Sequence, residues 1–141
     1  MPTILYAEDD QEQRSRMRMI LRDQNLILLE AANGQEALEK IERQRPDLIL
    51  LDLFMPKVDG IGVLEAIKSN SDTYHIPIIV ISAWPTGDNR DRARKAGAID
   101  FITKPYDPFE LVKIVKKYLT SPTKPLYHDY LDSNLVNELE E

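Results

Sequence analysis

Short apolar runs alternate along this chain with longer segments in which apolar and polar residues mix. The runs lie at residues 4–7, 26–29, 48–51, 78–81 and 99–103, and most of their side chains are aliphatic or aromatic. Strands that are covered on both faces of a parallel sheet have this continuous apolar pattern, whereas half-exposed strands alternate. The runs therefore predict five buried strands.

The segments between the runs have the three- and four-residue apolar spacing of amphipathic helices. In residues 11–24 the spacing is carried by Met17, Ile20 and Leu21, and Asn25 is predicted to stop this helix in the left-handed conformation. Four further helices are predicted at residues 34–45, near 60–67, at 88–96 with Asp88 as the cap, and near 111–119.

Strand and helix thus alternate five times, which favours a parallel sheet with helices on both faces. For five strands joined by right-handed crossovers, we predict a flavodoxin-like, doubly wound α/β fold with strand order 2-1-3-4-5. Its switch point lies between the first and third strands. We expect residues 1–119 to form one domain and residues 120–141 a short C-terminal extension.

Polar residues follow four of the apolar runs, at the point where each predicted strand ends. They are Glu8 and Asp9, Asp52, Ser82, and Lys104. Ligands of open parallel sheets bind in the crevice outside the carboxyl ends of the strands, so we expect these side chains to converge. Mg²⁺ prefers oxygen ligands and needs only one or two carboxylates. Asp9 and Asp52 are the predicted carboxylate ligands, with Glu8 as a second or water-mediated partner.

Asp52 has a second possible role, because a carboxylate can attack a phosphoryl group and form an acyl phosphate. The metal and Lys104 would then offset the charge on the transferring oxygens, and Ser82 could donate a hydrogen bond to the attached group. Three neighbouring acids without a cation should also repel one another and raise some pKa values.

Composition narrows the class of protein. The net charge of −6 argues against a general nucleic-acid-binding surface, and the absence of cysteine excludes disulfides and thiolate metal sites. No apolar run approaches the roughly 20 residues that span a bilayer. With no signal-peptide pattern either, we expect a cytoplasmic protein without a membrane partner.

The arginines of the first helix are predicted to form a solvated face: Arg14, Arg16, Arg18 and Arg22.

At its polar strand ends the sequence resembles the receiver domains of two-component response regulators. The matching segments are Glu8-Asp9, residues 52–60 (DLFMPKVDG), Ser82-Ala83 and residues 101–105 (FITKP), all in the same order as in that family. The resemblance covers roughly residues 3–119. Each motif is weak by itself, but the ordered set is specific.

The resemblance implies that Asp52 accepts a phosphoryl group from a histidine kinase or phosphotransfer protein. It also implies that Asp9 ligates Mg²⁺ directly and that the backbone carbonyl of Phe54 is another ligand. Such a module is not an enzyme in the usual sense, and at most it hydrolyses its own acyl phosphate slowly.

The resemblance further implies a conformational switch formed by Ser82 and Phe101. On phosphorylation Ser82 moves toward the phosphoryl oxygens, and Phe101 turns into the space that it leaves. The Lys104–Pro105 peptide bond is expected to be cis, as X-Pro bonds can be at low cost. The fourth helix, fifth strand and fifth helix form the expected surface for a downstream protein partner or a self-dimer.

Two large apolar residues stand where the family tunes the lifetime of the acyl phosphate. Phe54 lies two residues beyond Asp52, and Trp84 lies two residues beyond Ser82. Neither can orient an attacking water well, which predicts a long-lived phosphorylated state. The alternative is that Trp84 is an exposed contact for a partner.

The C-terminal extension has a pattern of its own. Prolines at 122 and 125 break the fifth helix, and Tyr127, Leu131, Leu135 and Leu139 then recur every four residues. This spacing predicts an acidic amphipathic helix. Either it docks on the receiver domain or on a partner, or the extension is a solvated tail or linker.

Two other functions remain to be weighed. A haloacid-dehalogenase-type phosphohydrolase also uses an aspartyl nucleophile and Mg²⁺, but it needs a second Asp two residues later, where this chain has Phe54. A degenerate receiver acting only as a binding adaptor would not need the complete set of site residues.

Overall fold

The computed structural model describes residues 1–84 and 86–120, and within them five parallel strands form one sheet in the order β2-β1-β3-β4-β5. This confirms the predicted flavodoxin-like fold. The strands are β1 (Thr3–Ala7), β2 (Ile27–Ala31), β3 (Leu48–Asp52), β4 (Ile78–Ser82) and β5 (Asp100–Thr103). The helix predicted in the C-terminal extension lies outside the described residues.

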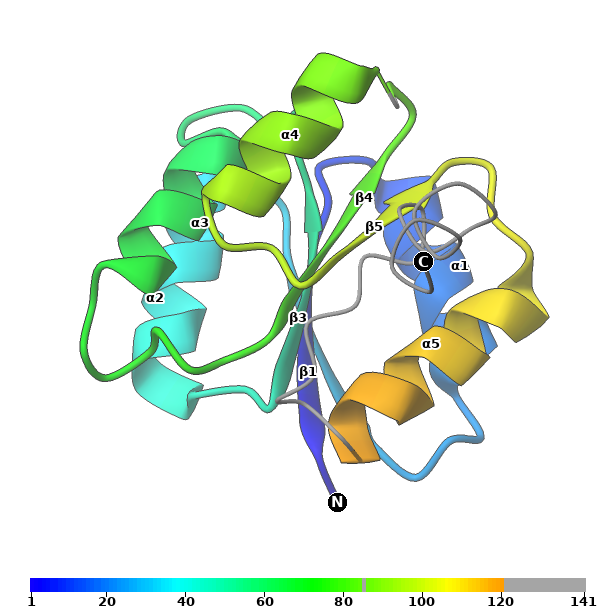
Figure 1. Ribbon diagram of the computed structural model, residues 1–141. Coiled ribbons are helices and arrows are strands. Elements are labelled where there is room, and N and C mark those ends of the chain that lie inside the picture. The colour runs from blue at the N-terminus through cyan, green and yellow to red at the C-terminus, as the bar shows by residue number, and fades with distance from the viewer. Residues whose placement is uncertain (85, 121–141) are drawn as a thin grey trace, which may run out of the picture.

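Helices cover both faces of the sheet. They are α1 (Gln11–Leu21), α2 (Gly34–Gln44), α3 (Gly60–Lys68), α4 (Gly87–Lys95) and α5 (Pro108–Thr120). Helices α1 and α5 pack on one face, and α2, α3 and α4 pack on the other (Figure 1). No helix within residues 1–84 and 86–120 is long and apolar enough to cross a membrane.

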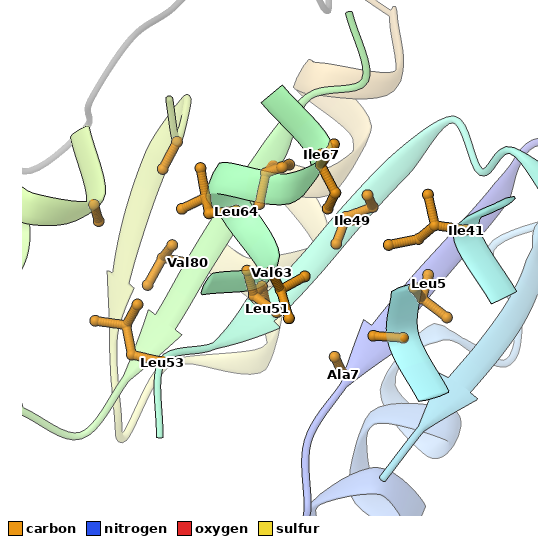
Figure 2. Close-up of a cluster of buried hydrophobic side chains, with 14 of the residues drawn as sticks. Leu5, Ala7, Ile41, Ile49, Leu51, Leu53, Val63, Leu64, Ile67 and Val80 are labelled. Carbon is orange, nitrogen blue, oxygen red and sulfur yellow. The ribbon is translucent and has the colours of Figure 1, made fainter. Parts of the chain in front are cut away.

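The continuous apolar runs are explained by these two layers of helices. Leu5 of β1 points into the core under α2 and α3, while its neighbour Tyr6 points into the core under α1 and α5. In Figure 2, Ile67 of α3 lies beside Ile49 of β3 in the first of these cores. Burying each such aliphatic side chain contributes about 1.5–3 kcal/mol, so neither face tolerates a polar residue in mid-strand without a partner.

The bounds of α1 and β2 differ from the predicted ones. Helix α1 ends at Leu21, before the predicted residue 24, and Asn25 takes its left-handed conformation (φ 54°) in the turn that follows. Strand β2 begins at Ile27 and continues to Ala31, beyond the predicted residues 26–29. Its bounds are set by parallel pairing with all five residues of β1, which local sequence does not encode.

The start of α4 was predicted incorrectly. Thr86 is the cap, since its side chain accepts a hydrogen bond from the backbone N–H of Asn89 at 3.1 Å. The predicted cap, Asp88, is instead in the first turn of the helix. Both Thr and Asp are favoured at such positions, as a cap and as an acid that complements the helix dipole respectively, so residue type alone did not separate them.

The loop after β3 is held close to the sheet by a glycine. Gly60 N–H donates to the Leu53 carbonyl at 2.8 Å, and a Cβ at residue 60 would lie only 2.5 Å from the Asp52 carbonyl oxygen. Any side chain at residue 60 would therefore push the end of β3 away from α3. This close approach fixes Asp52 at the edge of the crevice between β1 and β3.

Candidate functional site

Three acidic side chains meet where β1 and β3 end. Glu8 and Asp9 follow β1, Asp52 is the last residue of β3, and one carboxylate oxygen from each lies within 4.8 Å of the others. Glu8 and Asp52 are almost fully buried, with 1% and 6% of their surface exposed, whereas Asp9 is exposed. The convergence predicted from the strand ends is thus present in the structure.

Lys104 joins the three acids from the end of β5. Its Nζ donates to Glu8 Oε1 at 2.6 Å and lies 3.8 Å from Asp52 Oδ2. The Lys104–Pro105 peptide bond is cis, as the resemblance implied. The lysine therefore binds Glu8 most closely and contacts Asp52 at longer range.

The electrostatics of the cluster follow from this unequal pairing. Burial, and then the negative charge of Glu8, raise the pKa of Asp52 to about 7, against the opposing charge of Lys104. Burial also favours the neutral form of Glu8, but the hydrogen bond and charge of Lys104 outweigh it and lower the pKa of Glu8. Burial and the neighbouring Glu8 raise the pKa of Asp9. Two of the three acids thus show the mutual repulsion expected from the sequence.

These residues fit a hard divalent cation. The donor set consists of carboxylate oxygens, which Mg²⁺ prefers, and Asp9 is exposed at the mouth of the site, so an ion has a route in. Because Lys104 binds Glu8 most closely, the charges of Asp9 and Asp52 are the less completely neutralised ones. A cation there would offset both causes that raise the pKa values of Asp9 and Asp52, which are burial and the neighbouring charge of Glu8.

One positioning residue was missed by sequence reasoning. Arg14 of α1 donates to the backbone carbonyl of Glu8 at 2.6 Å and lies 3.6 Å from Glu30 of β2, which also pairs with Arg18 at 2.6 Å. The Glu8 N–H donates to the Ala31 carbonyl at 2.9 Å. Both backbone polar groups of Glu8 are therefore fixed, and the loop that carries Glu8 and Asp9 is tied to α1 and β2.

The prediction that the α1 arginines form a solvated face agrees with the exposure of Arg16, Arg18 and Arg22 and is wrong for Arg14, which is half-buried. Arg14 and Arg18 pair with Glu30, and the guanidinium of Arg16 lies over the Tyr106 ring, 5.5 Å from its centre. A signal was present in the sequence. Arg14 is in the first turn of α1, and helical side chains lean toward the helix N-terminus, here the loop with Glu8 and Asp9.

Ser82 and Phe101, the two residues of the expected switch, are both buried. Ser82 ends β4 beside β3, and its Oγ accepts a hydrogen bond from the Trp84 N–H at 3.1 Å. The Phe101 ring is in the core under α2, α3 and α4. Arg90 of α4 covers this ring, with its guanidinium 5.3 Å from the ring centre, and donates to Thr103 Oγ1 at 3.1 Å.

The two positions expected to tune the acyl-phosphate lifetime are both exposed. The Phe54 backbone N–H lies 3.4 Å from Asp52 Oδ1, while its ring is open to solvent. The Trp84 ring is also exposed. Exposure is compatible with shielding of the site and with a partner contact, so both interpretations stay predictions.

Comparison with known proteins decides the family. The model of the response regulator receiver domain matches residues 4–116 of this chain. The chain belongs to this family. Receiver domains are phosphoacceptor signalling modules of two-component systems and generally not enzymes, and this receiver domain is such a module.

The relatives include regulators longer than this chain and receiver domains of similar length. This receiver domain is 40% identical over 124 residues to the transcriptional regulatory protein ResD of Bacillus subtilis, an alignment that covers 88% of this chain and 50% of ResD. The chain thus spans about half the length of ResD. Among solved structures, the receiver domain of the Francisella response regulator 1452 has a TM-score of 0.80 at 28% identity, covering 87% of this chain and 100% of that one.

A second solved structure is described with a metal. The receiver domain of the sensor histidine kinase PA1611 from Pseudomonas aeruginosa, with a magnesium ion coordinated in the active site cleft, has a TM-score of 0.78 at 28% identity. The match covers 84% of this chain and 98% of that one.

Proposed function

We propose that Asp52 is the phosphoacceptor. Its carboxylate oxygen attacks the phosphorus of a phosphohistidine on a kinase or phosphotransfer protein, the P–N bond breaks, and an acyl phosphate and a free imidazole result. The observation that carries this proposal is the position of Asp52. It is the buried carboxylate at the end of β3, with Lys104 Nζ 3.8 Å away and two further acids within reach of one cation.

We further propose that the cluster holds Mg²⁺. Asp9 and Asp52 supply the carboxylates, the backbone carbonyl of Phe54 a further oxygen, and Glu8 binds through water because Lys104 already occupies it. When bound, the ion supplies positive charge beside the oxygens of the transferring group. The magnesium described in the related PA1611 receiver supports this assignment.

Lys104 and Ser82 are assigned to the phosphoryl group. Lys104 exchanges part of its contact with Glu8 for a phosphoryl oxygen, so its charge stays paired throughout. The Ser82 hydroxyl leaves the Trp84 N–H and donates a hydrogen bond to another phosphoryl oxygen. Both side chains interact with the negative charge of the phosphoryl group, which is absent while Asp52 is unphosphorylated.

The output is a shift in population between two conformers. Movement of Ser82 changes the space next to Phe101, whose ring now lies in the core under Arg90. The face formed by α4, β5 and α5 then changes its contacts with a downstream protein or a second copy. We expect no direct contact with nucleic acid, and we expect this exchange in the cytoplasm.

The phosphorylated state should be lost slowly. Phe54 and Trp84 place aromatic carbon where a polar side chain could orient water. Slow hydrolysis of its own acyl phosphate is therefore the only activity that we propose for this protein. Phe54→Asn and Trp84→Glu should each speed the loss of phosphate. Loss at an unchanged or slower rate would remove this part of the proposal.

We also propose that the receiver unit covers residues 1–119, with residues 120–141 as an extension.

The test of the main proposal is incubation with a small phosphodonor and Mg²⁺, followed by intact-mass measurement. A phosphoacceptor gains one phosphoryl group, the group is absent in Asp52→Asn, and chelation of Mg²⁺ prevents the reaction. Repeated release of phosphate without a modified protein would indicate a phosphohydrolase instead. An unmodified protein with donor and Mg²⁺ in excess would indicate a binding adaptor.

A further inference from the structure

An apolar groove lies on the side of the molecule away from α2, α3 and α4. It is formed between α1 and the first turns of α5, which are neighbours on one face of the sheet (Figure 1), and it has a volume of about 310 Å³. Its lining residues are Ile20, Gln24, Pro108, Phe109, Val112 and Lys113. Among these, Phe109 is 81% exposed, although it adjoins other apolar side chains. A contiguous apolar surface of this kind marks an interaction site more often than a single exposed side chain does.

We propose that the C-terminal extension of the same chain covers this groove, with residues 126–141 as an amphipathic helix. Tyr127, Leu131, Leu135 and Leu139 would form its apolar face, because residues four apart lie on one side of a helix. An isolated helix of this length is marginal in water, so the apolar face needs a surface to pack on. The groove beside α5 supplies that surface.

The length of the extension fits this position. It leaves the described part of the chain at Thr120, the last residue of α5, and the groove is at the other end of that helix, about 20 Å away. Pro122 and Pro125 prevent α5 from continuing, and residues 121–125 can span at most about 17 Å. A helix over residues 126–141 is about 24 Å long. When this helix runs antiparallel to α5, Leu131, Leu135 or Leu139 can contact Phe109.

The charges of the two elements are complementary. Residues 121–141 carry one lysine against five acids, a net charge of −4. The described part of α5 carries Lys113, Lys116 and Lys117 against Glu110, and Lys113 lines the groove itself. Docking would place the acidic face of the extension beside this basic stretch.

The covalent connection favours the same chain over a second copy. A segment tethered by a short linker has an effective concentration in the millimolar range, whereas a second copy must be recruited from solution. The inference goes beyond phosphotransfer and does not require Asp52 to be phosphorylated.

The experiment is hydrogen exchange of the full chain, read at the amides of residues 126–141. In Phe109→Asp these amides should exchange about tenfold faster or more, since one buried aromatic anchor is lost. Asp at this second position of α5 complements the helix dipole, so the variant should fold, which circular dichroism checks. Lys113→Glu should give a smaller acceleration that disappears at high salt.

Matched variants distinguish a contact from a general effect. Tyr74→Asp changes another exposed aromatic residue, which lies between α3 and β4, and should leave exchange of the extension unchanged. Leu131→Asp with Leu135→Asp should shift the NMR amide signals of Ile20 and Val112. Adding Phe109→Asp to these two substitutions should shift the amide signals of Ile20 and Val112 little further.

Two outcomes overturn the proposal. One is exchange of residues 126–141 at the same rate in the wild type and in Phe109→Asp, which shows that the extension does not use the groove. The other is protection that increases with protein concentration, which shows that a second copy covers it.

Discussion

Two buried carboxylates, one at the start of β5 and one at the end of β3, have different surroundings. Asp100, the first residue of β5, is fully buried and accepts hydrogen bonds from the Tyr118 hydroxyl at 2.9 Å and the Phe101 N–H at 2.7 Å. Asp52, the last residue of β3, faces the carboxylate of Glu8, and its pKa is raised to about 7. Two neutral donors bind Asp100, whereas Asp52 lies beside the like charge of Glu8 and has the Lys104 ammonium only at 3.8 Å.

The difference shows how a buried acid can be judged as structural or functional. A buried polar group that has its hydrogen bonds contributes to the fold, and Asp100 joins β5 to α5 in this way. A buried acid held next to another acid costs stability unless something else binds there. Residue type and burial are the same in both cases, so the neighbours decide.

The largest effect should separate the two acids completely. Asp52→Asn should abolish acyl-phosphate formation, because the nucleophilic oxygen is replaced by an amide. Asp100→Asn should still be phosphorylated, since Asp100 contributes to packing and not to the site. Intact mass after incubation with a small phosphodonor and Mg²⁺ measures both. Phosphorylation of Asp52→Asn, or its absence in a folded Asp100→Asn, would contradict the comparison.

In the absence of metal, Asp52→Asn should raise the free energy of unfolding, and Tyr118→Phe, which changes a partner of Asp100, should lower it. Because the folded pKa of Asp52 is raised, the ion-free fold loses stability as pH rises from about 4 to about 7, and Asp52→Asn removes that loss. We expect a gain of about 1–3 kcal/mol at pH 7.5. Tyr118→Phe removes one of the hydrogen bonds that Asp100 accepts and should cost about 1–3 kcal/mol.

Urea unfolding in the presence of a chelator measures both free energies. Repeating the Asp52→Asn measurement at pH 4 provides the control, since the gain should shrink there. A destabilised Asp52→Asn protein at pH 7.5 would show that Asp52 is structural after all.

Arg14 should affect metal binding more than folding. Arg14→Ala frees the carbonyl of Glu8 and loosens the loop that carries Asp9, so we expect Mg²⁺ affinity to fall about tenfold or more. Arg18→Ala is the matched control, because Arg18 pairs with Glu30 but does not contact Glu8. Titration with Mg²⁺ alone gives the affinities, and equal losses in both variants would show a general charge effect.

The smallest effect concerns pH. Mg²⁺ must displace the proton from Asp52, so affinity should fall as pH decreases through about 7. Between pH 7.5 and 6.5 we expect the Mg²⁺ affinity to fall about threefold, because the ionised fraction of Asp52 falls by that factor. The same titration with Asp52→Asn should be weaker throughout and less dependent on pH. An affinity independent of pH would contradict the raised pKa.

The fold and the acidic cluster could be predicted from the sequence because their signals are local. Each strand is a continuous apolar run, and Asp52, Ser82 and Lys104 each follow directly after one. Parallel topology then brings the strand ends together without any knowledge of side-chain contacts.

The contacts that tune the site could not be predicted in this way. The bond between Arg14 and the Glu8 carbonyl depends on how α1 rotates against β1, and the bond between Tyr118 and Asp100 depends on how α5 crosses β5. Lys104 was expected to meet the acids, but its preference for Glu8 over Asp52 depends on the packing of all three. Asp100 was passed over, although an acid within an apolar run signals a buried partner.

The guanidinium of Arg90 lies on the Phe101 ring, at the boundary between solvent and interior. A rotation of that ring would remove the surface on which the guanidinium rests and leave the hydrogen bond to Thr103 Oγ1 as a contact about which the side chain can turn. A change of packing inside the core would then alter the position of a positive charge on α4, where another molecule can contact it.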